Sequence, residues 1–262
     1  MTAGVDLRAG SRAVTGGPRP PLAGAGISIR DVFRIYREAD IETVALRGVD
    51  LEVEDGEYVA IMGRSGSGKS TLLQLIAGAD RPTAGQVIVA GVDLAQIDEA
   101  HRSSLRGSTI GLVFQSGNLV DFLDLIENVQ LACQLAGRPL AVPAVLEILD
   151  LVGLADAATR RAVQLSGGEQ QRAALAVILA SRPRVLLADE LTGELDRATA
   201  AMVLDLIDLV HATDRPTIVL ATHDPALAAR ADRVVELRDG RVVDGQLAAG
   251  PPAAGTPDEA AR

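Results

Sequence analysis

The 262-residue sequence contains few aromatic residues, one cysteine and one lysine. Aromatic side chains account for 2% of it and tryptophan is absent, which argues against a surface that stacks nucleic-acid bases. Its formal net charge of −10 also disfavours a general nucleic-acid binder, so no nucleic acid is expected as a partner. The chain is long enough to bury a sizeable core, and 48% of its residues are hydrophobic. Because aromatics are so few, this core is expected to be built from Ala, Val, Leu and Ile.

The single cysteine, Cys133, excludes an intramolecular disulfide and a Cys/His metal cluster. Long hydrophobic runs are also missing, since none approaches the ~20 residues that a bilayer-spanning helix needs. The N-terminal residues lack the continuous apolar stretch of a secretory signal. We therefore expect a chain that does not span a membrane and that works in the cytosol.

The two ends of the chain differ in composition from its middle. Residues 1–26 and 246–262 are rich in Gly, Ala and Pro without periodicity, and we expect both to be disordered tails. The segment 27–245 between them is the expected folded domain. Its first part alternates in hydrophobicity like β-strands. Strands are predicted at 27–35, 44–53, 58–62, 87–89, 110–114, 185–188 and 217–221.

Several of the later apolar runs are separated by segments with helical spacing. Continuous apolar strands flanked by helices predict an α/β fold, with a mainly parallel sheet covered on both faces and an antiparallel β lobe at the start. Residues from about 116 to 165 have helical spacing throughout, beginning near Leu119, and predict a helical insertion. Asp239-Gly240, between 233–237 and 241–243, predicts a tight hairpin.

Residues 63–70, GRSGSGKS, fit the phosphate-loop pattern G-x-x-x-x-G-K-[ST] between an apolar strand and a helical run. Such a loop turns backbone N–H groups toward phosphate at a helix N-terminus. Lys69, the only lysine, would bridge the β and γ phosphates, and Ser70 would coordinate Mg²⁺. The predicted nucleotide contacts here are Gly63, Ser65, Gly66, Gly68, Lys69, Ser70 and Thr71.

Two adjacent carboxylates, Asp189 and Glu190, end the apolar run 185–188. Alternation along a strand directs them to different sides, so that they can take separate roles. In a nucleotide site Asp189 would reach Mg²⁺, and Glu190 would orient and deprotonate the attacking water. The alternative for the pair on its own is an acidic strand end without a catalytic role.

The run 165–172, LSGGEQQR, opens another helical segment. Ser166 can cap this helix, and with Gly167 and Gly168 it offers a second anion-binding surface. The order of phosphate loop, LSGGEQQR and acidic strand resembles the ATP-binding cassette (ABC) ATPases. The resemblance covers about residues 27–245. It implies a P-loop NTPase core, ATP and Mg²⁺ as ligands, and ATP hydrolysis.

The resemblance implies roles for four further residues. Gln115 matches the glutamine that contacts the metal and water and links the core to the helical subdomain. His223 matches the histidine that contacts the γ-phosphate, and Asp196 matches the end of a loop that communicates between paired sites. Tyr36 resembles the aromatic residue that stacks on adenine, although ordinary packing explains it equally well.

Three positions depart from the family pattern. Leu191 stands where proline usually follows the catalytic glutamate, Glu194 occupies a position more often small or neutral, and Arg64 replaces a common proline. The reactive groups are all present. The departures bear on turnover and on coupling between sites.

In this family two nucleotide-binding domains pair head to tail around ATP, so the expected partners are a second copy or a related ATPase chain. The other expected partner is an integral membrane permease, which would hold the chain at the cytoplasmic face and contact about 116–130. Segments such as 91–94 and 110–115 resemble the branch of macrolide exporters, lipoprotein-release complexes and the cell-division transporter. The alternatives are a soluble ABC ATPase acting on ribosomes or DNA, and an ATP-binding regulatory subunit with little hydrolysis.

Overall fold

The computed structural model describes residues 26–39, 41–114, 117–191 and 197–243. Residues 1–25 and 244–262, which include nearly all of the predicted tails, lie outside these ranges. Within the described residues no helix is long and apolar enough to cross a bilayer.

A six-stranded sheet forms the centre of the molecule, in the order β10-β9-β3-β8-β7-β6. All neighbouring pairs are parallel except β10 with β9. The predicted hairpin is confirmed, because Asp239 and Gly240 adopt φ of 50° and 75° between β9 and β10. The strands are β3 (Tyr58–Met62), β6 (Ile110–Val113), β7 (Val185–Asp189), β8 (Thr217–Thr222), β9 (Arg233–Arg238) and β10 (Arg241–Val243).

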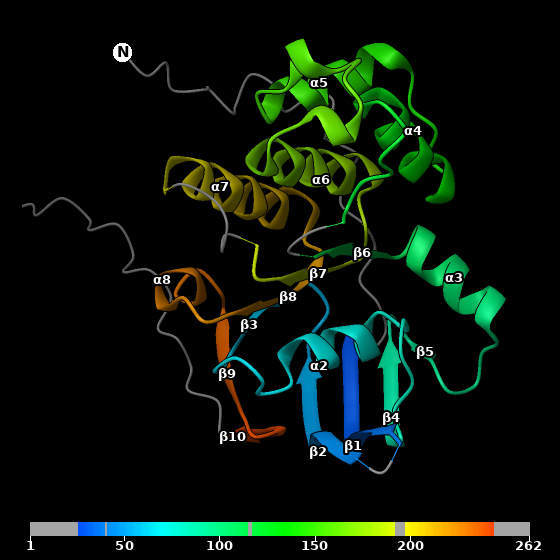
Figure 1. The fold of residues 1–262 in the computed structure, drawn as a ribbon, viewed down its shortest axis with the longest axis vertical. Coiled ribbons are helices and arrows are strands. Elements are labelled where there is room, and N and C mark those ends of the chain that lie inside the picture. The colour runs from blue at the N-terminus through cyan, green and yellow to red at the C-terminus, as the bar shows by residue number, and fades with distance from the viewer. Residues whose placement is uncertain (1–25, 40, 115–116, 192–196, 244–262) are drawn as a thin grey trace, which may run out of the picture.

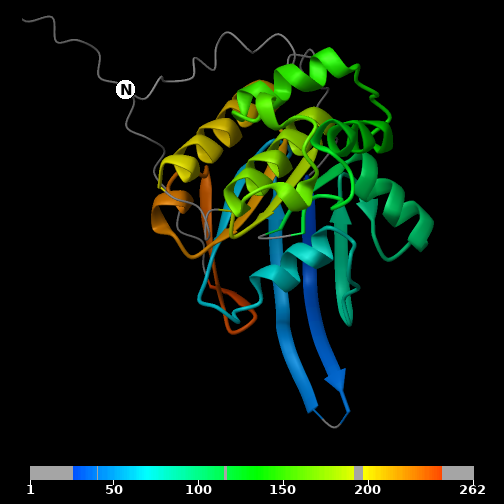
Figure 2. The ribbon, with the colours of Figure 1, turned by 45° about the horizontal axis from the view of Figure 1, so that its top comes forward.

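A second, antiparallel sheet of four strands has the order β2-β1-β4-β5. It corresponds to the predicted β lobe, and its strands β1 and β2 form a long hairpin that extends beyond the rest of the sheet (Figure 2). The strands are β1 (Ile27–Glu38), β2 (Ile41–Val53), β4 (Ala84–Val89) and β5 (Val92–Asp93).

Helices cover both faces of the six-stranded sheet (Figure 1). Helix α2 lies between the two sheets, whereas α6 and α7 lie on the opposite face, with α4 and α5 farther out. The helices are α2 (Lys69–Ile76), α3 (Glu99–Ser108), α4 (Leu125–Leu135), α5 (Val142–Leu151), α6 (Gly167–Ser181), α7 (Arg197–Asp214) and α8 (Pro225–Ala228), with 3₁₀ turns η1 (Ala155–Ala157) and η2 (Ala162–Gln164).

Strand β8 shows why the central strands are apolar throughout. Val219 and Ala221 belong to a core shared with α2 and the antiparallel sheet. Ile218 and Leu220 point the other way, into a core that includes residues of α6 and α7. Because successive side chains of a strand alternate in direction, a strand covered on both sides is apolar along its middle, here from Ile218 to Ala221.

The start of the first inserted helix corrects the sequence prediction. Helical spacing predicted a helix from about Leu119, but α4 begins only at Leu125. Asp124 and Glu127 form a capping box there, each side chain bonding the other residue's backbone N–H. This box defines a helix start. The buried Asn128 accepts from the Val120 N–H at 2.8 Å and holds the preceding segment as a loop.

Candidate active site

The candidate site lies where three neighbouring parallel strands end. The phosphate loop follows β3, Glu190 follows β7, and His223 comes one residue after β8. Parallel strands place their carboxyl ends at one edge of the sheet, where open α/β sheets bind ligands. The order β3-β8-β7 therefore brings together residues from three distant parts of the sequence.

The glycines of the phosphate loop are required by its backbone. Gly66 and Gly68 have φ of 78° and 104°, which favour glycine. A Cβ at Gly63 would lie 2.3 Å from the carbonyl oxygen of Leu237 and 2.5 Å from Oγ of Ser67. The loop is thus packed tightly against β9, and this packing fixes where its N–H groups lie.

Helix α2 begins directly after this loop, with Gly68 as its N-cap residue. Among the described residues no side chain caps it, and its first turn contains no acidic residue. The first N–H groups of a helix have no partner within the helix and carry partial positive charge. The N-terminus of α2 is therefore open to an anionic ligand.

A cavity of about 810 Å³ opens in front of the loop. It is lined by residues of the loop and of α2, together with Glu190, His223 and three residues of β2. Its lining residues are Thr43, Val44, Ala45, Arg64, Ser65, Gly66, Gly68, Lys69, Ser70, Thr71, Glu190 and His223. Such a volume is in the range of small-molecule sites.

Lys69 is buried at the floor of this cavity, with 7% of its side chain exposed. Its Nζ donates to the carbonyl oxygen of Gly63 at 2.8 Å and to that of Arg64 at 3.3 Å. It also lies 3.6 Å from Oε1 of Glu190. The ammonium thus faces both the phosphate loop and the carboxylate that follows β7.

Glu190 is held from several sides. Its N–H donates to the carbonyl oxygen of Ala221 on β8 at 3.0 Å, and its Oε2 lies 2.7 Å from Nδ1 of His223. Its φ of 49° lies in the left-handed region, a strained state that costs about 1–3 kcal/mol for a residue other than glycine. Leu191, the next residue, is buried in the core beneath α6 and α7 and anchors this turn.

Asp189 and Ser70 fit the requirements of a magnesium site. Oδ1 of Asp189 is buried and has no hydrogen-bond partner among the described residues, while Ser70 is exposed and lines the cavity. Mg²⁺ is held through one or two protein oxygens together with substrate phosphates and waters. The unpartnered carboxylate oxygen of Asp189 and the exposed hydroxyl of Ser70 are oxygen donors of this kind.

Tyr36 is engaged elsewhere. Its hydroxyl donates to Oδ2 of Asp80 at 3.0 Å, and the guanidinium of Arg34 lies 4.2 Å from its ring centroid. It does not line the cavity, although its strand partner Thr43 does. Stacking of Tyr36 on adenine stays a prediction.

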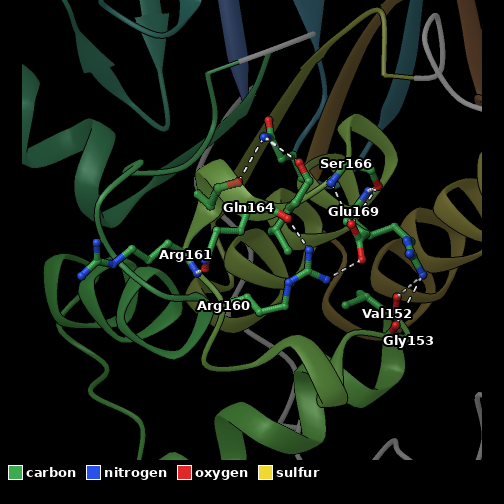
Figure 3. A network of polar contacts seen from close by, with 11 residues as sticks. Val152, Gly153, Arg160, Arg161, Gln164, Ser166 and Glu169 are labelled. Carbon is green, nitrogen blue, oxygen red and sulfur yellow. Dashed lines mark hydrogen bonds and ion pairs between the residues drawn. The ribbon is translucent and has the colours of Figure 1, made fainter.

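The second predicted anion surface, Ser166 to Gly168, also lies outside the cavity lining. Ser166 is the N-cap residue of α6, as predicted, and forms a capping box with Glu169. Its N–H and its hydroxyl both donate to Oε2 of Glu169, at 2.7 and 2.8 Å (Figure 3). The described residues of one chain therefore present the phosphate loop and this surface at separate places.

Later residues of the LSGGEQQR run hold the segment that precedes α6. Gln170 donates to the carbonyl oxygens of Ala162 and Leu165, and Arg172 donates to that of Val152. Sequence reasoning missed these structural roles and also missed Arg160, which pairs with Glu169 at 3.1 Å. No local pattern indicated that pairing.

Three predicted or discussed positions lie outside the described residues. These are Gln115, Asp196 and Glu194. The structure therefore gives no geometry for them.

Comparisons with known proteins identify the family of this chain. Residues 46–193 match the family described as "ABC transporter". A lipoprotein-releasing system ATP-binding protein LolD from Anaeromyxobacter dehalogenans is 46% identical over 85% of this chain and 95% of its own. A macrolide export ATP-binding/permease protein MacB from Hyphomonas neptunium is 42% identical over 86% of this chain, which spans 34% of that longer protein.

Solved structures agree in fold. A dimeric structure of the ATP-binding cassette MJ0796 in a post-hydrolysis state, bound to ADP and Pi, superposes with a TM-score of 0.80. It is 35% identical and covers 86% of this chain and 99% of that one. The chain therefore belongs to the ABC transporter family, as an ATP-binding and ATP-hydrolysing cassette related to lipoprotein-releasing and macrolide-export ATP-binding proteins.

Proposed function

We propose that two copies of this chain, or this chain and a related one, pair head to tail around ATP and Mg²⁺ and drive a membrane permease. The observation that carries the proposal is the division of the phosphate-binding elements. The cavity holds the loop, Lys69, Glu190 and His223 but not Ser166, Gly167 or Gly168. A second molecule that supplies its α6 N-terminus would complete each site.

The roles follow from the geometry of the cavity. Lys69, Ser65, Thr71 and the loop N–H groups would bind the triphosphate of ATP. Glu190 would act as general base toward water, a role for which its anchored carboxylate is already aimed into the cavity. His223, 2.7 Å from Glu190, would orient that carboxylate and contact the γ-phosphate.

Asp189 and Ser70 would hold Mg²⁺, with Gln115 as a further ligand. The metal, when bound, supplies positive charge that stabilises the charge developing on the phosphate oxygens. Asp196 would contact the paired site and Tyr36 the adenine. We assign the cassette to about residues 27–245 and its helical subdomain to about 116–165.

The permease would bind the segment of about 116–130, at the cytoplasmic face of the membrane. Phe122 supports this assignment because 72% of it is exposed, just before α4. An exposed aromatic side chain is an unusual surface residue and is common at protein interfaces. LolD is by its name part of a lipoprotein-releasing system, and this chain would likewise act within a permease complex.

The pairing is tested with Glu190→Gln, which keeps the shape of the side chain but removes the base. Phosphate release should fall at least about 100-fold, and size-exclusion chromatography with ATP should show a dimer that the ADP-bound protein does not form. Asp205→Asn, at an exposed position of α7, is a matched carboxyl-to-amide control. A variant that stays monomeric at saturating ATP, or that retains full turnover, would contradict the proposed function.

A further inference from the structure

The hydroxyl of Ser166 is already occupied in the isolated chain. It donates to Oε2 of Glu169 at 2.8 Å, and the Ser166 N–H donates to the same oxygen at 2.7 Å. An incoming phosphate must therefore replace the Glu169 carboxylate as acceptor of the Ser166 hydroxyl, while that carboxylate stays directly beside it. The Glu169 carboxylate and a phosphate bound to Ser166 would be close neighbours, and two such anions repel each other strongly once water is excluded.

Glu169 is ionised under ordinary conditions. The hydrogen bonds from the backbone and the side chain of Ser166 lower the pKa of Glu169 below its usual value. The first turn of α6 contributes in the same direction, since a helix N-terminus favours a negative charge. The negative charge at the second anion surface consequently persists at neutral pH.

Arg160 is the cation that balances this charge. One of its guanidinium nitrogens lies 3.1 Å from Oε1 of Glu169, the oxygen that faces away from Ser166. The other terminal nitrogen donates to the carbonyl oxygen of Gln164. Figure 3 shows the guanidinium between these two groups, with Arg161 directed away from the network.

We propose that Arg160 is a positioning residue for nucleotide-dependent pairing. It neutralises Glu169 and holds it on the α6 N-cap, so that the Ser166 hydroxyl can donate to a triphosphate bound by the partner chain. This inference rests on the proposed function and deepens it. Arg160 touches neither the cavity nor the nucleotide site of its own chain. Its effect reaches ATP through Glu169 and Ser166.

The charge can be removed without removing the cap. Glutamine replaces glutamate in a capping box, because its amide oxygen still accepts from the N-cap N–H. Glu169→Gln should therefore keep Ser166 in place and make Arg160 dispensable. A purely structural role for Arg160, through its bond to Gln164, would be indifferent to that change.

The experiment compares full-length variants in the Glu190→Gln background and measures the ATP concentration for half-maximal dimerisation by analytical ultracentrifugation. Arg160→Ala should raise this concentration about tenfold, as expected when one charge-assisted pair is lost. Arg160→Lys, which keeps the charge, should stay within about threefold of the parent. Arg161→Ala, an exposed neighbour of the same type, should leave it unchanged.

The decisive variant is Arg160→Ala with Glu169→Gln. Dimerisation within about threefold of the parent supports charge neutralisation, whereas a double variant as weak as Arg160→Ala overturns the inference. Melting temperature and binding of a fluorescent ADP analogue to the monomer report folding and the intact cavity for each variant. If the Glu190→Gln parent itself forms no dimer with ATP, the proposed function fails, and the inference falls with it.

Discussion

The N-termini of α2 and α6 are both expected to meet phosphate, but they are built in opposite ways. Gly68 caps α2 without a side chain, and no acidic residue lies in its first turn. Ser166 caps α6 within a complete capping box, and Glu169 places a carboxylate in its first turn. One end is open to an anion, whereas the other is already satisfied by its own residues.

This difference suggests an order of events. An open helix end needs no internal bond to be broken, so nucleotide should bind first at the phosphate loop. The α6 end must exchange an internal hydrogen bond for one to phosphate, and an exchange of this kind yields little net free energy. Pairing is therefore expected to be weak and reversible, which suits a cycle that opens after hydrolysis.

The largest expected effect is the loss of phosphate binding at the N-terminus of α2. Lys69→Ala should lower ATP affinity and turnover at least about 100-fold, because no other described side chain places an ammonium in the cavity. Lys69→Arg should also be impaired, since a planar guanidinium does not replace a compact ammonium. Both are measured by phosphate release and by binding of a fluorescent nucleotide. Full activity of Lys69→Arg would argue against this reading of the loop.

A smaller effect is expected on stability, because glycines near the N-termini of α2 and α6 differ in how tightly they are packed. Gly63→Ala should lower the free energy of unfolding by about 1–3 kcal/mol, because its Cβ would overlap the backbone of Leu237. A Cβ at Gly167 meets no atom of the described residues within 4 Å, so Gly167→Ala should change stability by less than about 0.5 kcal/mol. Urea titrations followed by circular dichroism give both values. Equal losses would mean that the loop is less tightly packed than described.

The capping boxes of α4 and α6 test whether the α6 N-terminus has a role beyond stability. Ser166→Ala and Asp124→Ala should each cost about 1 kcal/mol of stability, the usual value of an N-cap residue. Only Ser166→Ala should also weaken ATP-dependent dimerisation in the Glu190→Gln background. A similar loss of dimerisation with Asp124→Ala would show that any loosening of the helical subdomain is sufficient.

The smallest effect concerns Cys133 on α4, which is buried in the core of the helical subdomain. Burial raises the pKa of its thiol to about 11, so the unreactive neutral form prevails at neutral pH. Labelling by a thiol reagent should be very slow at pH 7.5, with or without ATP, and should accelerate as the pH approaches 11 or when urea is added. Fast labelling on addition of ATP would reveal that nucleotide opens this core.

Much of the fold and the site follows from short-range patterns. The apolar runs at 58–62, 185–188 and 217–221 predicted central strands because a strand buried on both faces is apolar on both of its sides. The phosphate loop was found from its own eight residues, and the Ser166 cap from its place before a helical run. These features can be predicted from the local sequence because each is formed by consecutive residues of one strand, loop or helix start.

Contacts between distant residues could not be predicted in this way. The Arg160–Glu169 pair joins residues nine positions apart across an irregular segment. The buried Arg182–Asp214 pair joins residues 32 positions apart and ties the ends of α6 and α7 together. The start of α4 was missed for a different reason, because apolar spacing from Leu119 outweighed the Asp124–Glu127 capping signal.

The alternation of β8 between two cores has a consequence for how the chemistry is maintained. A shift of β8 by one residue against β7 would exchange its side chains between the two cores, so the shape in which these side chains pack, and not their apolar character, holds the register. That register sets the carbonyl of Ala221 opposite the Glu190 N–H and brings His223 beside it. The backbone beneath the reactive side chains is therefore set by packing in the two cores, and replacing one of these side chains should leave the strand ends in place.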